Sequence, residues 1–101
     1  MAKIIKVDGT IVRNVKPQDG VSFSLEEMCK HIGCDLIEPI YLENCIMVVD
    51  EEGWLKENVQ LNVVASAYLV LKTKAYREKH NLGVPGPLVG NVLVCSNNEF
   101  Q

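Results

Sequence analysis

The amino-acid sequence predicts an α+β fold, in which a mostly antiparallel sheet carries two helices in the order β-β-α-β-β-α-β. Short β-branched runs separated by tight turns are typical of hairpins and therefore of antiparallel pairing. Two other segments place apolar residues at helical spacing. The chain has 101 residues, of which 48% are hydrophobic and 23% charged, values typical of one globular domain. We expect that domain to span residues 1–95 and a polar, frayed tail to follow over residues 96–101.

The first predicted element is a β-hairpin. Strand-like runs over residues 4–7 and 10–15 flank Asp8 and Gly9, a dipeptide typical of a tight hairpin turn. The turn-rich residues 16–20 end the second strand.

A short helix is predicted next. Ser24 is an N-cap candidate, and Glu27 three residues later completes a capping box. Phe23 and Met28 occupy the two positions of a hydrophobic staple. Gly33 is the expected stop. The predicted buried face carries Leu25, Met28, Cys29 and Ile32.

Two further strands are predicted over residues 35–42 and 45–49, joined by a turn at 42–44. Proline cannot donate to a sheet ladder, so Pro39 places the first of them at an edge or a bulge. An acidic turn over residues 50–53 follows.

The second predicted helix begins after Asn62 and ends at residues 81–83. We expect its first half to be buried and residues 72–79 to be solvated. A rigid loop over residues 83–87 leads to a final strand over residues 88–95. The predicted apolar stripe comprises Val64, Ala65, Tyr68, Leu71 and Ala75.

Composition limits the classes of function. The net charge is −3 and the sequence pI is about 5.3, which argues against broad nucleic-acid binding. The longest uncharged run, residues 58–71, is too short to cross a membrane. We see no signal peptide, so we expect a cytoplasmic protein. The cysteines are then expected to be reduced; they are Cys29, Cys34, Cys45 and Cys95.

Several motifs in this order resemble a domain-of-unknown-function family of short proteins from phages, bacterial mobile elements and large DNA viruses. They are IIKVDGT at residues 4–10, FSLEE at 23–27, IMVV at 46–49, EEG at 51–53, LK at 55–56 and VGNVLVC at 89–95. The resemblance covers nearly the whole chain. It implies a small accessory protein of viral or mobile-element origin in the host cytoplasm, and it implies no catalytic residue. Two segments, at residues 57–61 and 72–87, are longer here than the corresponding segments usual in that family.

The sequence predicts no enzyme, cofactor or metal site. Cys29, His31 and Cys34 lie within six residues of each other, but the paired C-x2-C spacing typical of zinc ligands is missing. A cysteine nucleophile would need a base, and only His31 and His80 are available. We therefore name no catalytic residue, and an enzyme is the third of three hypotheses.

The first hypothesis is a protein-interaction module, including a homodimer. Trp54 follows the acidic turn, where it is either folded back onto the core or presented to a partner. We place Trp54 and Tyr41 in the predicted interface, together with an uncovered sheet edge.

The second hypothesis is a binder of a small anionic ligand, such as a nucleotide sponge in counter-defence. The end of the second helix is basic, and lysine and arginine clusters often hold phosphates. The glycine-rich loop that follows is a candidate ligand-facing segment. The candidate ligand-binding residues are Lys72, Tyr76, Arg77, Lys79 and Gly86.

Overall fold

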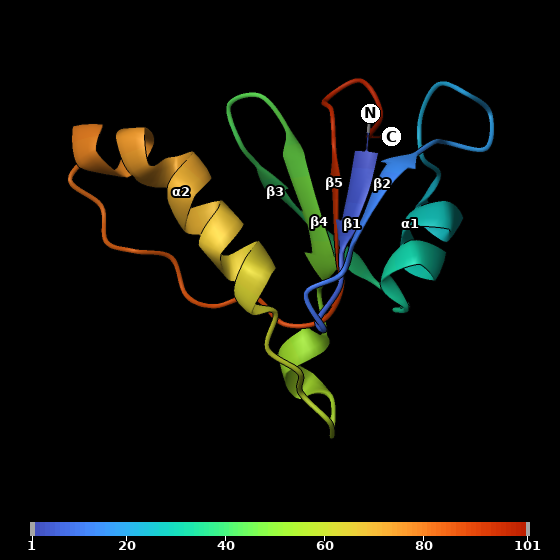
Figure 1. Ribbon diagram of the computed structural model, residues 1–101, viewed down its shortest axis with the longest axis horizontal. Coiled ribbons are helices and arrows are strands. Elements are labelled where there is room, and N and C mark those ends of the chain that lie inside the picture. Colours follow the sequence, from blue (N-terminus) through green and yellow to red (C-terminus); the bar gives the residue numbers. More distant parts are fainter. Residues whose placement is uncertain (1, 101) are drawn as a thin grey trace.

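The computed structural model describes residues 2–100 and shows a five-stranded sheet between two helices (Figure 1). The elements are β1 (Ala2–Ile5), β2 (Ile11–Val15), α1 (Leu25–Ile32), β3 (Ile37–Tyr41), β4 (Ile46–Asp50), the 3-10 turn η1 (Gly53–Leu55), α2 (Val63–Lys79) and β5 (Val92–Cys95). The α+β class and the order of the elements are confirmed.

The strands lie in the order β2-β1-β5-β4-β3, and each adjacent pair is antiparallel. The last strand is therefore central, between the β1–β2 hairpin and the β3–β4 hairpin. All four residues of β5 are buried, as expected for a strand covered on both faces. Strand β3, which contains Pro39, lies at an edge as predicted.

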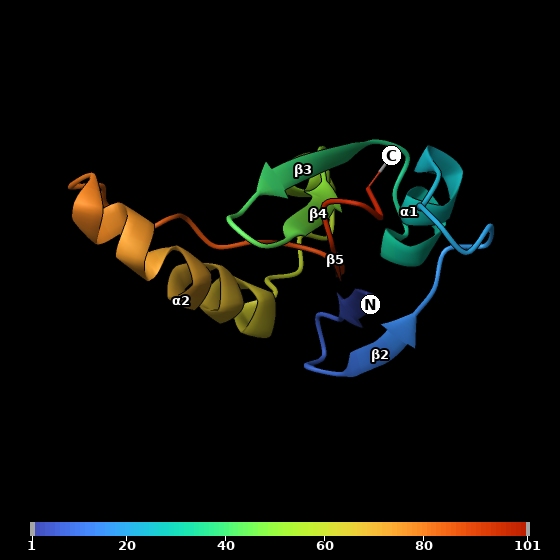
Figure 2. The same ribbon diagram turned by 90° about the horizontal axis from the view of Figure 1, so that it is seen from above.

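Side chains alternate between two apolar clusters on the two faces of the sheet. Ile4, Val48 and Leu93 pack with Met28 of α1. The residues next to them along the strands pack on the other face with Ala65 and Leu69 of α2; they include Ile5, Met47 and Val92. Figure 2 shows the two helices on opposite faces of the sheet.

The predicted caps of α1 are confirmed. The Ser24 side chain accepts a hydrogen bond from the Glu27 backbone N–H, the Glu27 carboxylate accepts one from the Ser24 N–H, and Gly33 ends the helix at φ 80°. Met28 and Ile32 are buried as expected. Leu25 is not, with 57% of its surface exposed, and Cys29 is only partly buried.

The predicted stripe of α2 is only partly correct. Of the stripe, Ala65 is buried and Tyr68 half-buried, whereas Val64, Leu71 and Ala75 are exposed. Leu69, outside the stripe, is the other buried residue. The expectation of a buried first half is also wrong, since Val63 is 73% exposed. The reason for the exposure of Leu71 and Ala75 is visible in Figures 1 and 2, where α2 meets the sheet near its first turns and then runs away from it. Its second half, residues 72–79, is largely solvated, as the sequence predicts.

Two expectations near the C-terminus are wrong. Strand β5 begins at Val92, not at residue 88, since Gly90 has a φ of 76° that breaks the extended run. Residues 96–100 are not frayed: the Phe23 N–H donates to the Glu99 carbonyl at 2.7 Å, and Phe100 packs against the α1 side of the core. The frayed-tail prediction for Gln101 lies outside the described residues.

Within residues 2–100, no helix is long and apolar enough to cross a membrane.

Candidate functional site

Two cavities lie near opposite ends of β1. The first is lined in part by Val7, which follows the strand, and the second is lined in part by Lys3. We call them the polar cavity and the basic cavity. Between the end of β4 and α2, a loop that borders the polar cavity also carries a third feature, an exposed apolar surface.

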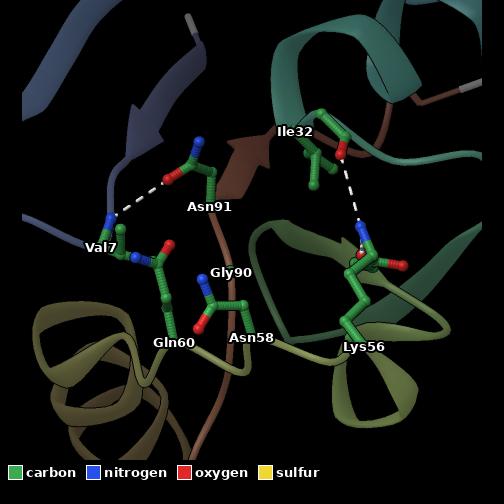
Figure 3. Close-up of a pocket in the computed structure, with 10 residues that line it drawn as sticks. Val7, Ile32, Lys56, Asn58, Gln60, Gly90 and Asn91 are labelled. Carbon is green, nitrogen blue, oxygen red and sulfur yellow. Dashed lines mark hydrogen bonds and ion pairs between the residues drawn. The ribbon is translucent and has the colours of Figure 1, made fainter.

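The polar cavity has a volume of about 300 Å³ and is shown in Figure 3. The amide side chains of Asn58 and Gln60 point into it from the loop that precedes α2. The Asn91 carboxamide oxygen accepts a hydrogen bond from the Val7 N–H at 3.1 Å. The lining residues are Val7, Ile32, Gly33, Asp50, Gly53, Lys56, Asn58, Gln60, Gly90 and Asn91.

An internal ion pair neutralises the charges of the polar cavity. Lys56 Nζ lies 2.6 Å from Asp50 Oδ2, and the Asp50 side chain is only 6% exposed. The hydrogen bond to Asp50 raises the pKa of Lys56. The cavity thus offers amides without net charge, which suits a neutral polar group better than an anion.

The same Asp50 shapes the loop that follows β4. Its Oδ1 accepts a hydrogen bond from the Glu52 N–H at 2.9 Å, and the Leu55 N–H donates to the Glu52 carbonyl at 3.0 Å. Gly53 is buried against Val89, so closely that an added Cβ would lie 2.7 Å from a Val89 methyl group. The backbone of this loop is therefore tightly fixed.

This fixed loop presents large apolar side chains to solvent. Trp54 is 58% exposed and Leu55 is 81% exposed. Of the two alternatives for Trp54, the structure therefore shows the outward one. Val59 and Leu61 are also exposed a few residues later. Three exposed glutamates accompany them, Glu51, Glu52 and Glu57. We call residues 51–61 the acidic segment.

A second exposed apolar surface lies on the projecting half of α2 and the loop after it (Figure 2). Its large apolar side chains are Leu71, Tyr76, Leu82 and Val84. Lys74 and Lys79 are exposed among them. We call residues 71–84 the basic arm.

The structure separates the residues predicted to bind a ligand. The Arg77 guanidinium donates to Thr73 Oγ1 at 3.0 Å and to the Val70 carbonyl at 2.9 Å, so it lies along its own helix. The rings of Tyr76 and His80 lie 4.3 Å apart. Lys79 and Gly86 line neither cavity described above, whereas Lys72 lines the basic cavity.

The two predicted interface residues also lie apart. Tyr41 is exposed at the end of β3 that pairs with Ile46. Its ring meets that of Phe100 edge-on at 6.1 Å. Trp54 follows the other end of β4, beyond Asp50. The two aromatic side chains therefore belong to different surfaces.

The basic cavity has a volume of about 450 Å³. The sequence did not identify Lys3, Arg13 and Tyr68 as lining one cavity, because they lie far apart in the chain and form no local motif. The lining residues are Ala2, Lys3, Arg13, Asn14, Asn44, Cys45, Tyr68, Lys72, Val94, Cys95 and Ser96.

A family model described as a domain of unknown function, DUF3846, matches residues 2–101. The chain belongs to this family. The match confirms the resemblance to a family without a described activity. No curated protein and no solved structure matches the chain.

Two cysteines of the DUF3846 domain, Cys34 and Cys95, are held as thiols. Burial raises the pKa of Cys34 to about 12, with Cys29 close by as a second cause. Burial also raises the pKa of Cys95 to about 11. A protonated thiol is a poor nucleophile and metal ligand. Within the described part of the chain, no three His, Cys, Asp or Glu side chains form a group that could hold a metal ion.

Proposed function

We propose that the protein acts by binding rather than by catalysis, as a protein-interaction module whose partner is a second copy of the chain. The observation that carries this proposal is the tightly fixed loop that holds Trp54 and Leu55 outward. Binding is also favoured over chemistry by the mutual pairing of Asp50 and Lys56 in the polar cavity.

A fixed loop lowers the cost of association. Large exposed apolar groups are typical of interfaces, and tryptophan is among the residues that most often dominate binding energy. Ordering a mobile side chain or loop at an interface costs free energy, which a preformed loop avoids. The Asp50–Lys56 ion pair and the close packing of Gly53 hold the loop before any partner arrives.

Charge complementarity points to a second copy as the partner. The acidic segment carries exposed Glu51, Glu52 and Glu57 together with its apolar side chains, and the basic arm carries exposed Lys74 and Lys79 together with its own. Opposite charges around two apolar surfaces favour their contact and its orientation. In a two-fold dimer, the acidic segment of each copy would meet the basic arm of the other, so that the contact occurs twice.

Sedimentation velocity over a concentration series tests this proposal. We expect a concentration-dependent dimer for the natural chain. In the double variant Trp54→Ser/Leu55→Ser, the dissociation constant should rise by at least about 30-fold, the equivalent of about 2 kcal/mol for one lost hot spot.

The matched control is Leu25→Ser, which removes an exposed leucine from α1 on another surface; its exposed fraction, 57%, is close to that of Trp54. Its dissociation constant should match that of the natural chain. A natural chain that stays monomeric at about 1 mM, the range of very weak association, overturns the proposal. So does an equal loss of dimer in the control variant.

We also propose that the protein is an accessory protein of a virus or mobile element that works in the host cytoplasm. The family resemblance supports this origin, and four cysteines without a disulfide suit a reducing compartment. Expressing cells lysed in iodoacetamide should yield a protein alkylated at all four cysteines, measured by intact mass. A disulfide-linked mass at natural expression levels would contradict the cytoplasmic location.

A further inference from the structure

We infer that the basic cavity binds the phosphate group of a small molecule of about nucleotide size. Lys3 of β1, Arg13 of β2 and Lys72 of α2 line one cavity of about 450 Å³. That volume lies within the range of small-molecule sites, roughly 300–1,000 Å³. This inference does not rest on self-association: Lys72 is the one residue of the basic arm that it uses, and it uses nothing of the acidic segment.

An irregularity in the sheet builds the cavity wall. Ala2 pairs with Val15 and Ile4 pairs with Val12, so that Lys3 alone lies opposite Arg13 and Asn14. Two residues opposite one is the signature of a β-bulge, a feature that often re-aims side chains near functional sites. Asn14 has a φ of 58°, a left-handed conformation that is uncommon for residues other than glycine.

Three cations line the cavity, and one carboxylate lies close to its wall, because Glu99 Oε1 accepts a hydrogen bond from the Ser96 N–H at 3.0 Å. Lys3 Nζ lies 4.6 Å from the centroid of the Tyr68 ring and Lys72 Nζ lies 5.4 Å from the same centroid. Cation–π attraction holds both ammonium groups near the ring. No carboxylate lines the cavity, and within residues 2–100 none of Lys3, Arg13 and Lys72 forms an ion pair. An anion bound between these cations would relieve their mutual repulsion.

The neutral groups of the cavity suit phosphate oxygens. Asn14 and Asn44 carry amide donors and Ser96 carries a hydroxyl donor at its wall. Burial, with Cys45 as a second cause, raises the pKa of Tyr68, so the phenol stays protonated at neutral pH. Arginine and lysine with such donors are the usual partners of phosphate.

A small molecule fits better than nucleic acid. The cations surround one cavity instead of following a line, and the chain as a whole carries a net charge of −3. Nucleic-acid binding draws on an extended positive surface. We therefore infer a compact ligand with a terminal phosphate group, for which adenosine monophosphate and inorganic phosphate are suitable probes.

The test is an NMR titration of the full-length chain at constant ionic strength, with inorganic phosphate and then adenosine monophosphate. We expect saturable shifts of the amide resonances of Lys3, Asn14, Tyr68 and Lys72. In the double variant Lys3→Gln/Lys72→Gln, the affinity for both probes should fall at least tenfold, as expected for losing charge-assisted hydrogen bonds.

Lys30→Gln is the matched control, because it removes the same charge from an exposed site on α1, outside the cavity and outside both proposed dimer surfaces. Its affinity should stay within about twofold of the natural chain, well below the effect of one charge-assisted hydrogen bond. Non-saturable shifts, or an equal loss in Lys30→Gln, would overturn the inference. Tighter binding of a single-stranded oligonucleotide without terminal phosphate would also overturn it and would indicate nucleic acid instead.

Discussion

Asn62 does more at the residue scale than cap a helix. Its Oδ1 accepts a hydrogen bond from the Ala65 N–H at 3.0 Å, which is the predicted cap. Its Nδ2 also donates to the carbonyls of Ile5 and Gly90, each at 2.9 Å, and the residue is fully buried. One side chain thus joins the start of α2 to the end of β1 and to the segment that precedes β5.

Replacing Asn62 by aspartate separates these two roles. The substitution keeps the cap acceptor but places a carboxylate oxygen against two carbonyl oxygens. We expect Asn62→Asp to lower the free energy of unfolding by at least about 3 kcal/mol, measured by urea denaturation. The exposed Asn98→Asp serves as the control. A loss of less than about 1 kcal/mol for Asn62→Asp, the net value of one ordinary hydrogen bond, would contradict this role.

Gly53 is required by space rather than by backbone conformation. A Cβ at this position would lie 2.7 Å from Val89 Cγ2. We expect Gly53→Ala to cost about 1–3 kcal/mol of unfolding free energy, the usual range for overpacking. Gly86→Ala should be close to neutral, since no atom lies within 4 Å of the added Cβ.

A double-mutant cycle tests the cause of the Gly53 effect. Val89→Ala removes the methyl group that an alanine at position 53 would meet. The double variant Gly53→Ala/Val89→Ala should therefore lose less stability than the sum of the two single variants. Strict additivity would mean that the contact with Val89 is not the cause.

At the scale of elements, α1 follows from its local sequence. Ser24, Glu27 and Gly33 specify its two ends without help from the rest of the chain, so both ends could be predicted. The structure adds one contact that the sequence does not reveal, since Glu27 Oε2 also accepts a hydrogen bond from the Gln18 N–H at 2.7 Å. The capping glutamate thereby fastens the preceding loop to the helix.

This contact predicts a pH dependence of stability. The hydrogen bonds from the Gln18 and Ser24 N–H groups lower the pKa of Glu27 below its ordinary value of 4.5. A lowered folded-state pKa means that the stabilisation is complete above pH 4.5 and is lost as the pH falls through the folded-state pKa. We expect Glu27→Gln to flatten the fall in unfolding free energy below that pH, measured by urea denaturation from pH 7 downward.

Other carboxylates contribute to the same profile, since backbone hydrogen bonds also lower the pKa of Asp8 and of Asp19. The flattening should therefore be partial. Glu26→Gln is the matched control, because Glu26 lies in the same turn without these contacts. An unchanged acid profile in Glu27→Gln would contradict the proposed role of its carboxylate.

Helix α2 shows where local patterning is insufficient. Its N-cap and its solvated second half follow from the sequence, but its buried stripe does not. Leu71 and Ala75 satisfy helical periodicity, yet their burial depends on how far the helix follows the sheet. Because α2 leaves the sheet early (Figure 1), apolar side chains in its second half stay exposed and form part of the basic arm.

At the scale of the whole molecule, the hairpins could be predicted and their arrangement could not. Turn residues such as Asp8 and Gly9 specify local pairing. The insertion of β5 between β1 and β4 is a long-range contact with no local signal. The basic cavity depends on that insertion and on the bulge at Arg13 and Asn14, so its residues could not be assembled from the sequence.

The exposed surfaces were predictable only in part. The sequence identified Trp54 as a candidate interface residue and the basic end of α2 as a candidate ligand site, under two alternative hypotheses of function. The structure places them on two surfaces of opposite charge, the acidic segment and the basic arm. Self-association through these two surfaces is the central proposal, and it requires that their charges match across two copies.

The most direct test is sedimentation of two charge-reversed variants, alone and mixed. One variant carries Glu51→Lys, Glu52→Lys and Glu57→Lys, so both of its surfaces are basic. The other carries Lys74→Glu and Lys79→Glu, so both of its surfaces are acidic. We predict that each variant alone is monomeric and that their equimolar mixture forms a heterodimer, since both contacts regain opposite charges. Monomers in the mixture, or dimers of either variant alone, would contradict the proposal.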